Sequence, residues 1–187
     1  PYGSQRSPTA QWTATAAGCC IVGRASEGPY VTHITRGRIV DLGVTDMTNM
    51  GAAMAPAACD TLQALFRETN TGPGDYDLIV TGDLGAVGHD LVVELFRREG
   101  VELARYTDCG LLLYDREAQD MHAGGSGCGC SAAVLNGYLL EGMRQGRWRR
   151  LLFAPTGALL SPTSSFQGES IPGICHAVVL AADKEDA

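Results

Sequence analysis

A glycine-rich loop followed by a helix and a buried strand is the feature that most restricts the fold of this chain. The loop HAGGSGCGCS (122–131) contains four glycines. Because glycine has no side chain, it allows a backbone to approach another group closely or to adopt positive φ. Apolar residues then recur at helical spacing from Ala132 to Met143, and Gly146 ends the run. The segment LLFA (151–154) is typical of a short, fully buried strand. A helix directly followed by an unbroken apolar strand indicates an α/β fold.

A polar loop, TGALLSPTSSFQGES (156–170), follows that strand and carries no positive charge. Open α/β sheets bind their ligands beyond the carboxyl ends of their strands. Ser126 or Ser131 is expected to cap the helix that follows the glycine-rich loop. The N-terminal amides of that helix, at 127–131, favour an anion. The two loops together predict a ligand-binding site.

Helices and apolar strands alternate along the rest of the chain. Asp46, Thr48 or Asn49 is expected to cap the first long helix. The predicted helices are 52–69 and 90–98, and the predicted strands are 13–22, 30–41 (one strand or a hairpin), 76–81 and 176–182. This alternation predicts a layered α/β sheet.

The charge balance argues against nucleic-acid binding, because the formal net charge is −7. One basic cluster is visible in the sequence, and we interpret it as cations at the negative end of a helix: Arg144, Arg147, Arg149 and Arg150. No run reaches the roughly 18 apolar residues that a membrane span needs. No signal peptide is visible, and the opening PYGSQRSPTAQW is expected to be the middle of a longer protein.

The sequence contains seven cysteines, an odd number, and most of them lie in apolar surroundings. We expect reduced, buried side chains in an intracellular chain. Cys128 and Cys130 are spaced too tightly for a zinc pair, so no metal site is predicted, and Cys109 is assigned to the core. The loop at 124–131 also lacks the lysine of a phosphate-binding loop and follows no clear strand, so no cofactor is predicted.

Two of the four histidines are candidates for ligand binding. His89 stands at the start of a predicted helix and His122 directly before the glycine-rich loop, although each could simply neighbour a helix cap. His33 is expected in a strand or at the surface, and His176 in the core.

Longer segments carry a resemblance that covers nearly the whole chain. They resemble the stage V sporulation AD family, a branch of the thiolase-like superfamily: TAQWT (9–13), NMGAAMAPAACDT (49–61), TGDLGAVG (81–88), GGSGCGCSAAVLNGYLL (124–140) and TGALLSPTSSFQGESIPGICHAVV (156–179). The resemblance implies a layered αβαβα fold built from two similar halves. Residues 1–44 would then form a linker and the closing strands of the N-terminal half, and residues 45–187 the C-terminal half.

The same resemblance implies a role in spore formation. It predicts binding of dipicolinic acid (pyridine-2,6-dicarboxylate) for uptake into the developing spore. Other stage V sporulation A membrane proteins would be partners. A homodimer is expected, located in the forespore or spore and peripheral to the inner spore membrane.

Enzymes of this superfamily use a nucleophilic cysteine in the first half, with histidine or asparagine groups in the second. Their second-half motif aligns Ser126 with the histidine or asparagine, and serine is a poor general base. The resemblance therefore implies a non-catalytic binding protein. There are two alternatives. The protein could be a residual acyl-transfer enzyme, or a scaffold that only dimerises or docks on membrane proteins. The predicted ligand-binding residues are His89, His122, Ser126, Gly127, Thr156, Ser161, Thr163, Ser164 and Phe166, the last as a wall for the pyridine ring.

Overall fold

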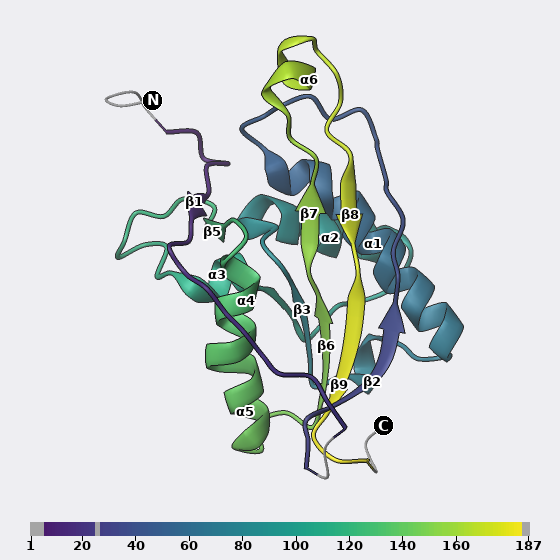
Figure 1. Ribbon diagram of the computed structural model, residues 1–187. Coiled ribbons are helices and arrows are strands. Elements are labelled where there is room, and N and C mark those ends of the chain that lie inside the picture. Colours follow the sequence, from purple (N-terminus) through teal and green to yellow (C-terminus); the bar gives the residue numbers. More distant parts are fainter. Residues whose placement is uncertain (1–5, 25–26, 185–187) are drawn as a thin grey trace.

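A five-stranded mixed sheet forms the centre of the protein in a computed structural model that describes residues 6–24 and 27–184 (Figure 1). Its strand order is β2-β9-β6-β3-β4. Strands β6, β3 and β4 are parallel, β9 runs antiparallel to β6, and β2 runs antiparallel to β9. The strands are β2 (Tyr30–Thr35), β3 (Leu78–Thr81), β4 (Tyr106–Asp108), β6 (Arg150–Ala154) and β9 (Ala177–Ala181).

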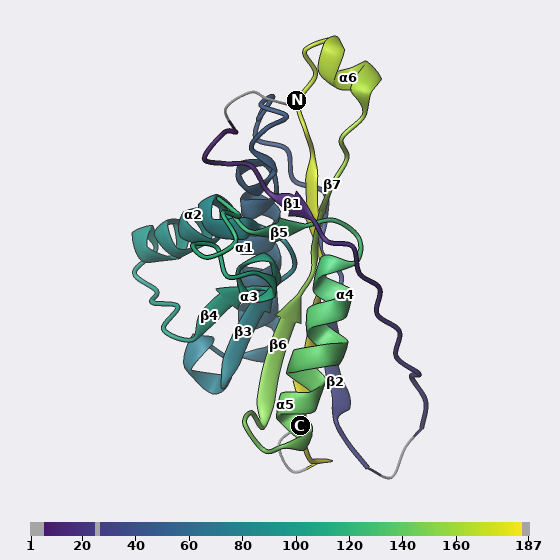
Figure 2. The same cartoon turned by 90° about the vertical axis from the view of Figure 1, so that its left-hand side faces the viewer.

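Helices cover both faces of this sheet because its apolar residues alternate between two cores. Ile79, Leu152 and Val179 pack toward α1 (Met50–Thr69) and α2 (Gly85–Arg98). Val80, Leu151 and Phe153 belong to the opposite core. That face carries α3 (Cys109–Leu113) and a continuous helical run of α4 (Cys130–Val134), the π-helical turn η2 (Leu135–Leu139) and α5 (Leu140–Arg144). Figure 2 shows the sheet between these two helical layers.

The long helix α1 is defined by its ends and by its small residues. Asn49 caps the N-terminus by accepting a hydrogen bond from the Ala52 amide, which confirms one of the three predicted caps. Asn70 ends the helix in the left-handed conformation. Gly51 lets α1 lie against α2, since a Cβ there would stand 2.4 Å from the Leu84 carbonyl oxygen.

Shorter elements extend from the sheet. β1 (Trp12–Thr13) pairs in parallel with β5 (Gly125–Ser126). β7 (Thr156–Ala158) and β8 (Gly173–Cys175) form a hairpin, and Figure 1 shows its tip, with α6 (Pro162–Phe166), projecting beyond the sheet. A single 3-10 turn, η1 (Pro73–Asp75), precedes β3. No helix among the described residues is both long and apolar enough to cross a membrane.

The layered α/β architecture predicted from the sequence is confirmed, and several local predictions are wrong. The strand at 13–22 is limited to β1, because residues 15–24 are exposed and pair with no neighbouring strand. Helix α2 begins at Gly85 rather than at 90, and the polar loop after β6 contains the β7–β8 hairpin. Gly129 occupies the N-cap of α4, so neither Ser126 nor Ser131 caps it. The boundary at residue 44 stays a prediction.

Candidate functional site

Three polar residues meet at one edge of the sheet because the parallel strands β3, β4 and β6 end there. Asp83 lies two residues beyond β3, Asp108 ends β4, and Thr156 lies two residues beyond β6. The carboxyl ends of parallel strands are the usual place for a ligand in an open α/β sheet. The glycine-rich loop, through β5, approaches the same edge.

The Asp83 carboxylate connects these segments. The Ser126 hydroxyl donates to Asp83 Oδ2 at 3.0 Å, and the Gly127 amide donates to the same oxygen at 2.9 Å. The Thr156 hydroxyl donates to Asp83 Oδ1 at 3.2 Å. We call Gln11, Asp83, Ser126, Gly127 and Thr156 the Asp83 cluster. The Gly127 amide, predicted to favour an anionic ligand, is thus bonded to a carboxylate of the protein itself.

An N-terminal arm, residues 9–14, completes the cluster. The Gln11 side-chain amide donates to the Asp83 carbonyl oxygen at 2.8 Å and to the Gly125 carbonyl oxygen at 3.0 Å. The Ala14 amide donates to the Ser126 carbonyl oxygen at 2.8 Å, next to the β1–β5 pairing. Gln11 therefore holds the two loops of the site at a fixed separation. The sequence analysis missed this residue, although it lies in the TAQWT segment.

Asp108 supports the loop that carries Asp83. Its fully buried carboxylate accepts hydrogen bonds from the Thr81 hydroxyl and from the amides of Leu84, Gly85 and Gly110. Burial raises the pKa of Asp108, while the bonds from Thr81 and the three amides oppose that rise. Asp83 and Asp108 were both missed from the sequence; Asp83 could have been found as an acidic residue two positions after the predicted strand 76–81, whereas no strand was predicted before Asp108.

Two buried thiols lie near the cluster. Burial raises the pKa of Cys130 to about 12, and the charges of Asp83 and Asp108 act in the same direction. Burial likewise raises the pKa of Cys109, with Asp108 adding to the effect. Both thiols are therefore protonated at neutral pH, and a protonated thiol is a poor nucleophile.

The prediction that the cysteines are buried is correct for four of them and wrong for three. Cys59, Cys109, Cys130 and Cys175 are buried, whereas Cys19, Cys20 and Cys128 are exposed. Cys19 and Cys20 belong to the segment after β1 that pairs with no strand, and Cys128 lies in the glycine-rich loop ahead of α4. All seven are free thiols in the structure.

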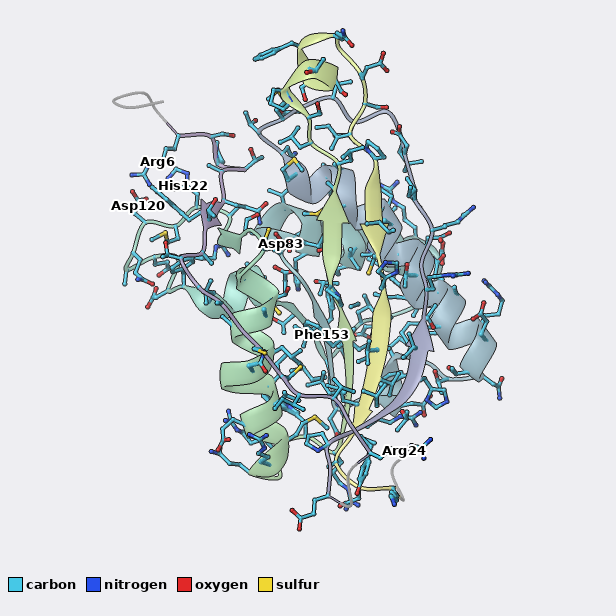
Figure 3. The ribbon with its side chains drawn as sticks, in the orientation of Figure 1. Arg6, Arg24, Asp83, Asp120, His122 and Phe153 are labelled. Carbon is cyan, nitrogen blue, oxygen red and sulfur yellow. The ribbon has the colours of Figure 1, made fainter. Side chains whose placement is uncertain are left out.

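The structure does not bring the two candidate histidines into the cluster. His122 Nδ1 lies 2.9 Å from the Ser7 carbonyl oxygen, and its Nε2 lies 3.4 Å from Asp120. Figure 3 shows His122 beside Asp120, apart from Asp83. The His89 ring stacks on Tyr106 at 4.7 Å and hydrogen-bonds to Asp90.

The remaining predicted residues lie at the α6 tip. Ser161, Thr163 and Ser164 belong to α6 or its N-cap, and Phe166 is 84% exposed. None of them has a hydrogen bond to the Asp83 cluster among the described residues, so their ligand role stays a prediction. His33 lies half-buried on β2 as expected, but His176 is exposed, because it is the single residue between β8 and β9 and not inside a strand.

A sequence profile of one family, stage V sporulation protein AD, matches residues 1–181. The chain belongs to this family. It is 43% identical to the stage V sporulation protein AD of Bacillus subtilis (strain 168) over 179 residues, which are 95% of this chain and 53% of that protein. The chain thus spans about half the length of this curated relative. The resemblance drawn from the sequence segments is confirmed.

Solved structures similar to the chain are condensing enzymes and a thiolase. The tetronic acid condensing enzyme AbyA1 is 15% identical, with a TM-score of 0.47 over 86% of this chain and 49% of that one. The 3-oxoacyl-(acyl carrier protein) synthase III of Pseudomonas aeruginosa PAO1 is 12% identical, with a TM-score of 0.44 over 87% and 49%. Human mitochondrial 3-ketoacyl-CoA thiolase is 13% identical, with a TM-score of 0.42 over 80% and 30%.

Proposed function

We propose that this chain is part of a non-catalytic protein that binds dipicolinic acid for its uptake into the developing spore. The observation that supports it best is the Asp83 cluster, in which the Ser126 and Thr156 hydroxyls bond to a carboxylate at the edge of the sheet where the parallel strands end. Hydroxyls bind a ligand without exchanging protons with it at neutral pH. The name of the family supplies the sporulation context.

The two thiols near the site are not activated as nucleophiles for acyl transfer. A nucleophilic cysteine needs a lowered pKa, and burial moves the pKa of Cys130 in the opposite direction, to about 12. The hydrogen bonds that the described residues make to the Asp83 carboxylate come from Ser126, Gly127 and Thr156, and none comes from a histidine. A turnover assay with an acyl thioester tests this part of the proposal, and enzymatic rates would contradict it.

The hydroxyls of the Asp83 cluster can donate hydrogen bonds to a dicarboxylate ligand if they rotate. A hydroxyl hydrogen rotates about its C–O bond, so Ser126 and Thr156 can donate to a ligand carboxylate instead of to Asp83. The charge of Asp83 opposes a second carboxylate nearby. Removing that charge while keeping the shape, as in Asp83→Asn, is therefore expected to tighten dipicolinate binding several-fold.

Calorimetric titration of the complete protein with dipicolinate tests the site. Ser126→Ala and Thr156→Val should each weaken binding by about tenfold, the effect of losing one hydrogen bond to a charged group. Ser165→Ala, in the α6 tip, serves as the matched control and should leave the affinity unchanged. Unchanged affinity in both cluster variants would overturn the assignment, and the same titration with His122→Ala and Ser161→Ala decides whether those residues take part.

Partners and location belong to the same proposal. The other stage V sporulation A membrane proteins would receive or deliver the ligand, and the protein would act as a homodimer at the inner membrane of the forespore or spore. Sedimentation of the complete protein and its recovery with spore membranes in sporulating cells test these points. A monomer absent from those membranes would contradict them.

A further inference from the structure

A second basic cluster lies at the end of β2, on a different part of the molecule from the Asp83 cluster. Arg36, Arg38 and Arg67 line a pocket of about 320 Å³. Arg67 comes from α1, whereas Arg36 and Arg38 follow β2, so only the fold brings the three together. From the sequence, only the arginines at 144–150 were identified as a basic cluster. Three guanidinium groups around one hollow are unexpected in a chain with a net charge of −7.

The backbone at Gly37 fixes the two arginines beside it. A Cβ on Gly37 would stand 1.8 Å from the Cys175 carbonyl oxygen and 2.3 Å from the Thr61 hydroxyl oxygen. The Gly37 amide also donates to His176 Nδ1 at 3.2 Å. The Arg-Gly-Arg segment is therefore held against the end of β8 and against α1, and the rim of the pocket has a defined backbone.

The positive charge of the pocket is only partly balanced. Asp60 is the one carboxylate among the described residues that lines it, and Arg38 already holds Asp60 in a two-pronged contact at 2.9 and 2.6 Å. Arg67 also lowers the pKa of Asp60, although less than Arg38 does, which places the Arg67 charge on the same side of the pocket. The nearby Gln63 amide is bonded to Glu99.

Arg36 and Arg67 remain available for a ligand. Neither guanidinium makes a hydrogen bond within residues 6–24 and 27–184, and both side chains are exposed. Guanidinium groups present a planar fork of donors that matches carboxylate and phosphate oxygens. A pocket of this size lies at the lower end of the range for small-molecule sites.

We propose that this pocket binds a small oxyanion carrying two or more negative charges, with Arg36 and Arg67 as its main ligands and Arg38 bridging it to Asp60. Phosphate groups and small dicarboxylates share this chemistry. The proposal is independent of ligand binding at the Asp83 cluster.

Titration of the complete, isotopically labelled protein with inorganic phosphate tests the pocket, followed by NMR at about 0.15 M ionic strength, where distant surface charges are screened. We expect saturable shifts at residues 36–38 and 60–67. Arg36→Gln and Arg67→Gln should each weaken binding by about tenfold. Both positions are exposed, so the variants should melt at the temperature of the parent.

Arg144→Gln is the matched control, because it removes the same charge from the other basic cluster and should leave binding unchanged. A parallel titration with dipicolinate separates the two sources of oxyanion, and saturable binding of either one at this pocket supports the proposal. No saturable shift with either anion would overturn it, as would equal weakening by Arg144→Gln. Loss of dipicolinate binding in the Ser126→Ala variant with phosphate binding intact would show that the two sites are separate.

Discussion

Three residues of the Asp83 cluster (Ser126, Gly127 and Thr156) and the residues of the α6 tip were predicted to form one ligand-binding site, but only the former are hydrogen-bonded to Asp83. At the cluster, loops after two strands, a glycine-rich loop and the N-terminal arm are joined by hydrogen bonds. At the tip, Leu159 is 71% exposed and Phe166 is 84% exposed. The difference is one of distance from the sheet. The register of the sheet fixes residues just beyond a strand, but residues farther along a hairpin lack that support.

The largest expected difference between a buried and an exposed position is in the reactivity of their thiols. A rise in the pKa of Cys130 from 9.0 to about 12 leaves about a thousandfold less thiolate at a given pH. Iodoacetamide at pH 8, followed by peptide mass spectrometry, should modify Cys128 rapidly and Cys130 very slowly. Equal rates at these two cysteines would contradict the buried position of Cys130.

The buried carboxylate beneath the cluster should matter most for stability. Asp108→Ala leaves the amides of Leu84, Gly85 and Gly110 without their acceptor. We expect a loss of about 3 kcal/mol or more in the free energy of unfolding, from the cost of unsatisfied buried donors. Denaturant unfolding measures it. Asp108→Asn keeps an acceptor and should cost less, and equal costs for the two variants would argue against this explanation.

Asp83 should have a smaller effect because it is only half-buried. Asp83→Ala removes the acceptor of three hydrogen bonds, and we expect a cost of about 1–3 kcal/mol. The loss in the free energy of unfolding should be smaller for Asp83→Asn than for Asp83→Ala. Hydrogen exchange at the Gly127 amide gives a local readout, since its protection should drop in Asp83→Ala. Retained protection would show that the amide does not depend on this carboxylate.

The smallest effect is expected at the tip. Phe166→Ala should change the free energy of unfolding by no more than about 0.5 kcal/mol, as is usual for an exposed side chain. Phe153→Ala is the matched control, because the same substitution in the core should cost about 3–5 kcal/mol. A large loss at Phe166 would show that the tip packs against another surface in the complete protein.

The periodicity of apolar residues predicted the main helices and strands, because the spacing of apolar residues along a segment reflects which of its sides is buried. The two loops beside the predicted helix and strand, together with the family resemblance, predicted Ser126, Gly127 and Thr156 in one site, and they do meet at Asp83. His122 and Phe166 were predicted in the same site but are not bonded to the Asp83 cluster, since no local sequence pattern gives the direction in which a loop leaves the sheet. Gln11 was missed for a related reason: its partners lie 72 and 114 residues away.

The reach of Gln11 has a consequence for the order in which the protein folds. Contacts between residues so distant along the chain close long loops, and the entropy lost in closing them is recovered only when the intervening structure has formed. The sheet and its helices can assemble from nearer neighbours. We therefore expect the Asp83 cluster to form late in folding, when the N-terminal arm bonds to a loop more than a hundred residues farther along the chain.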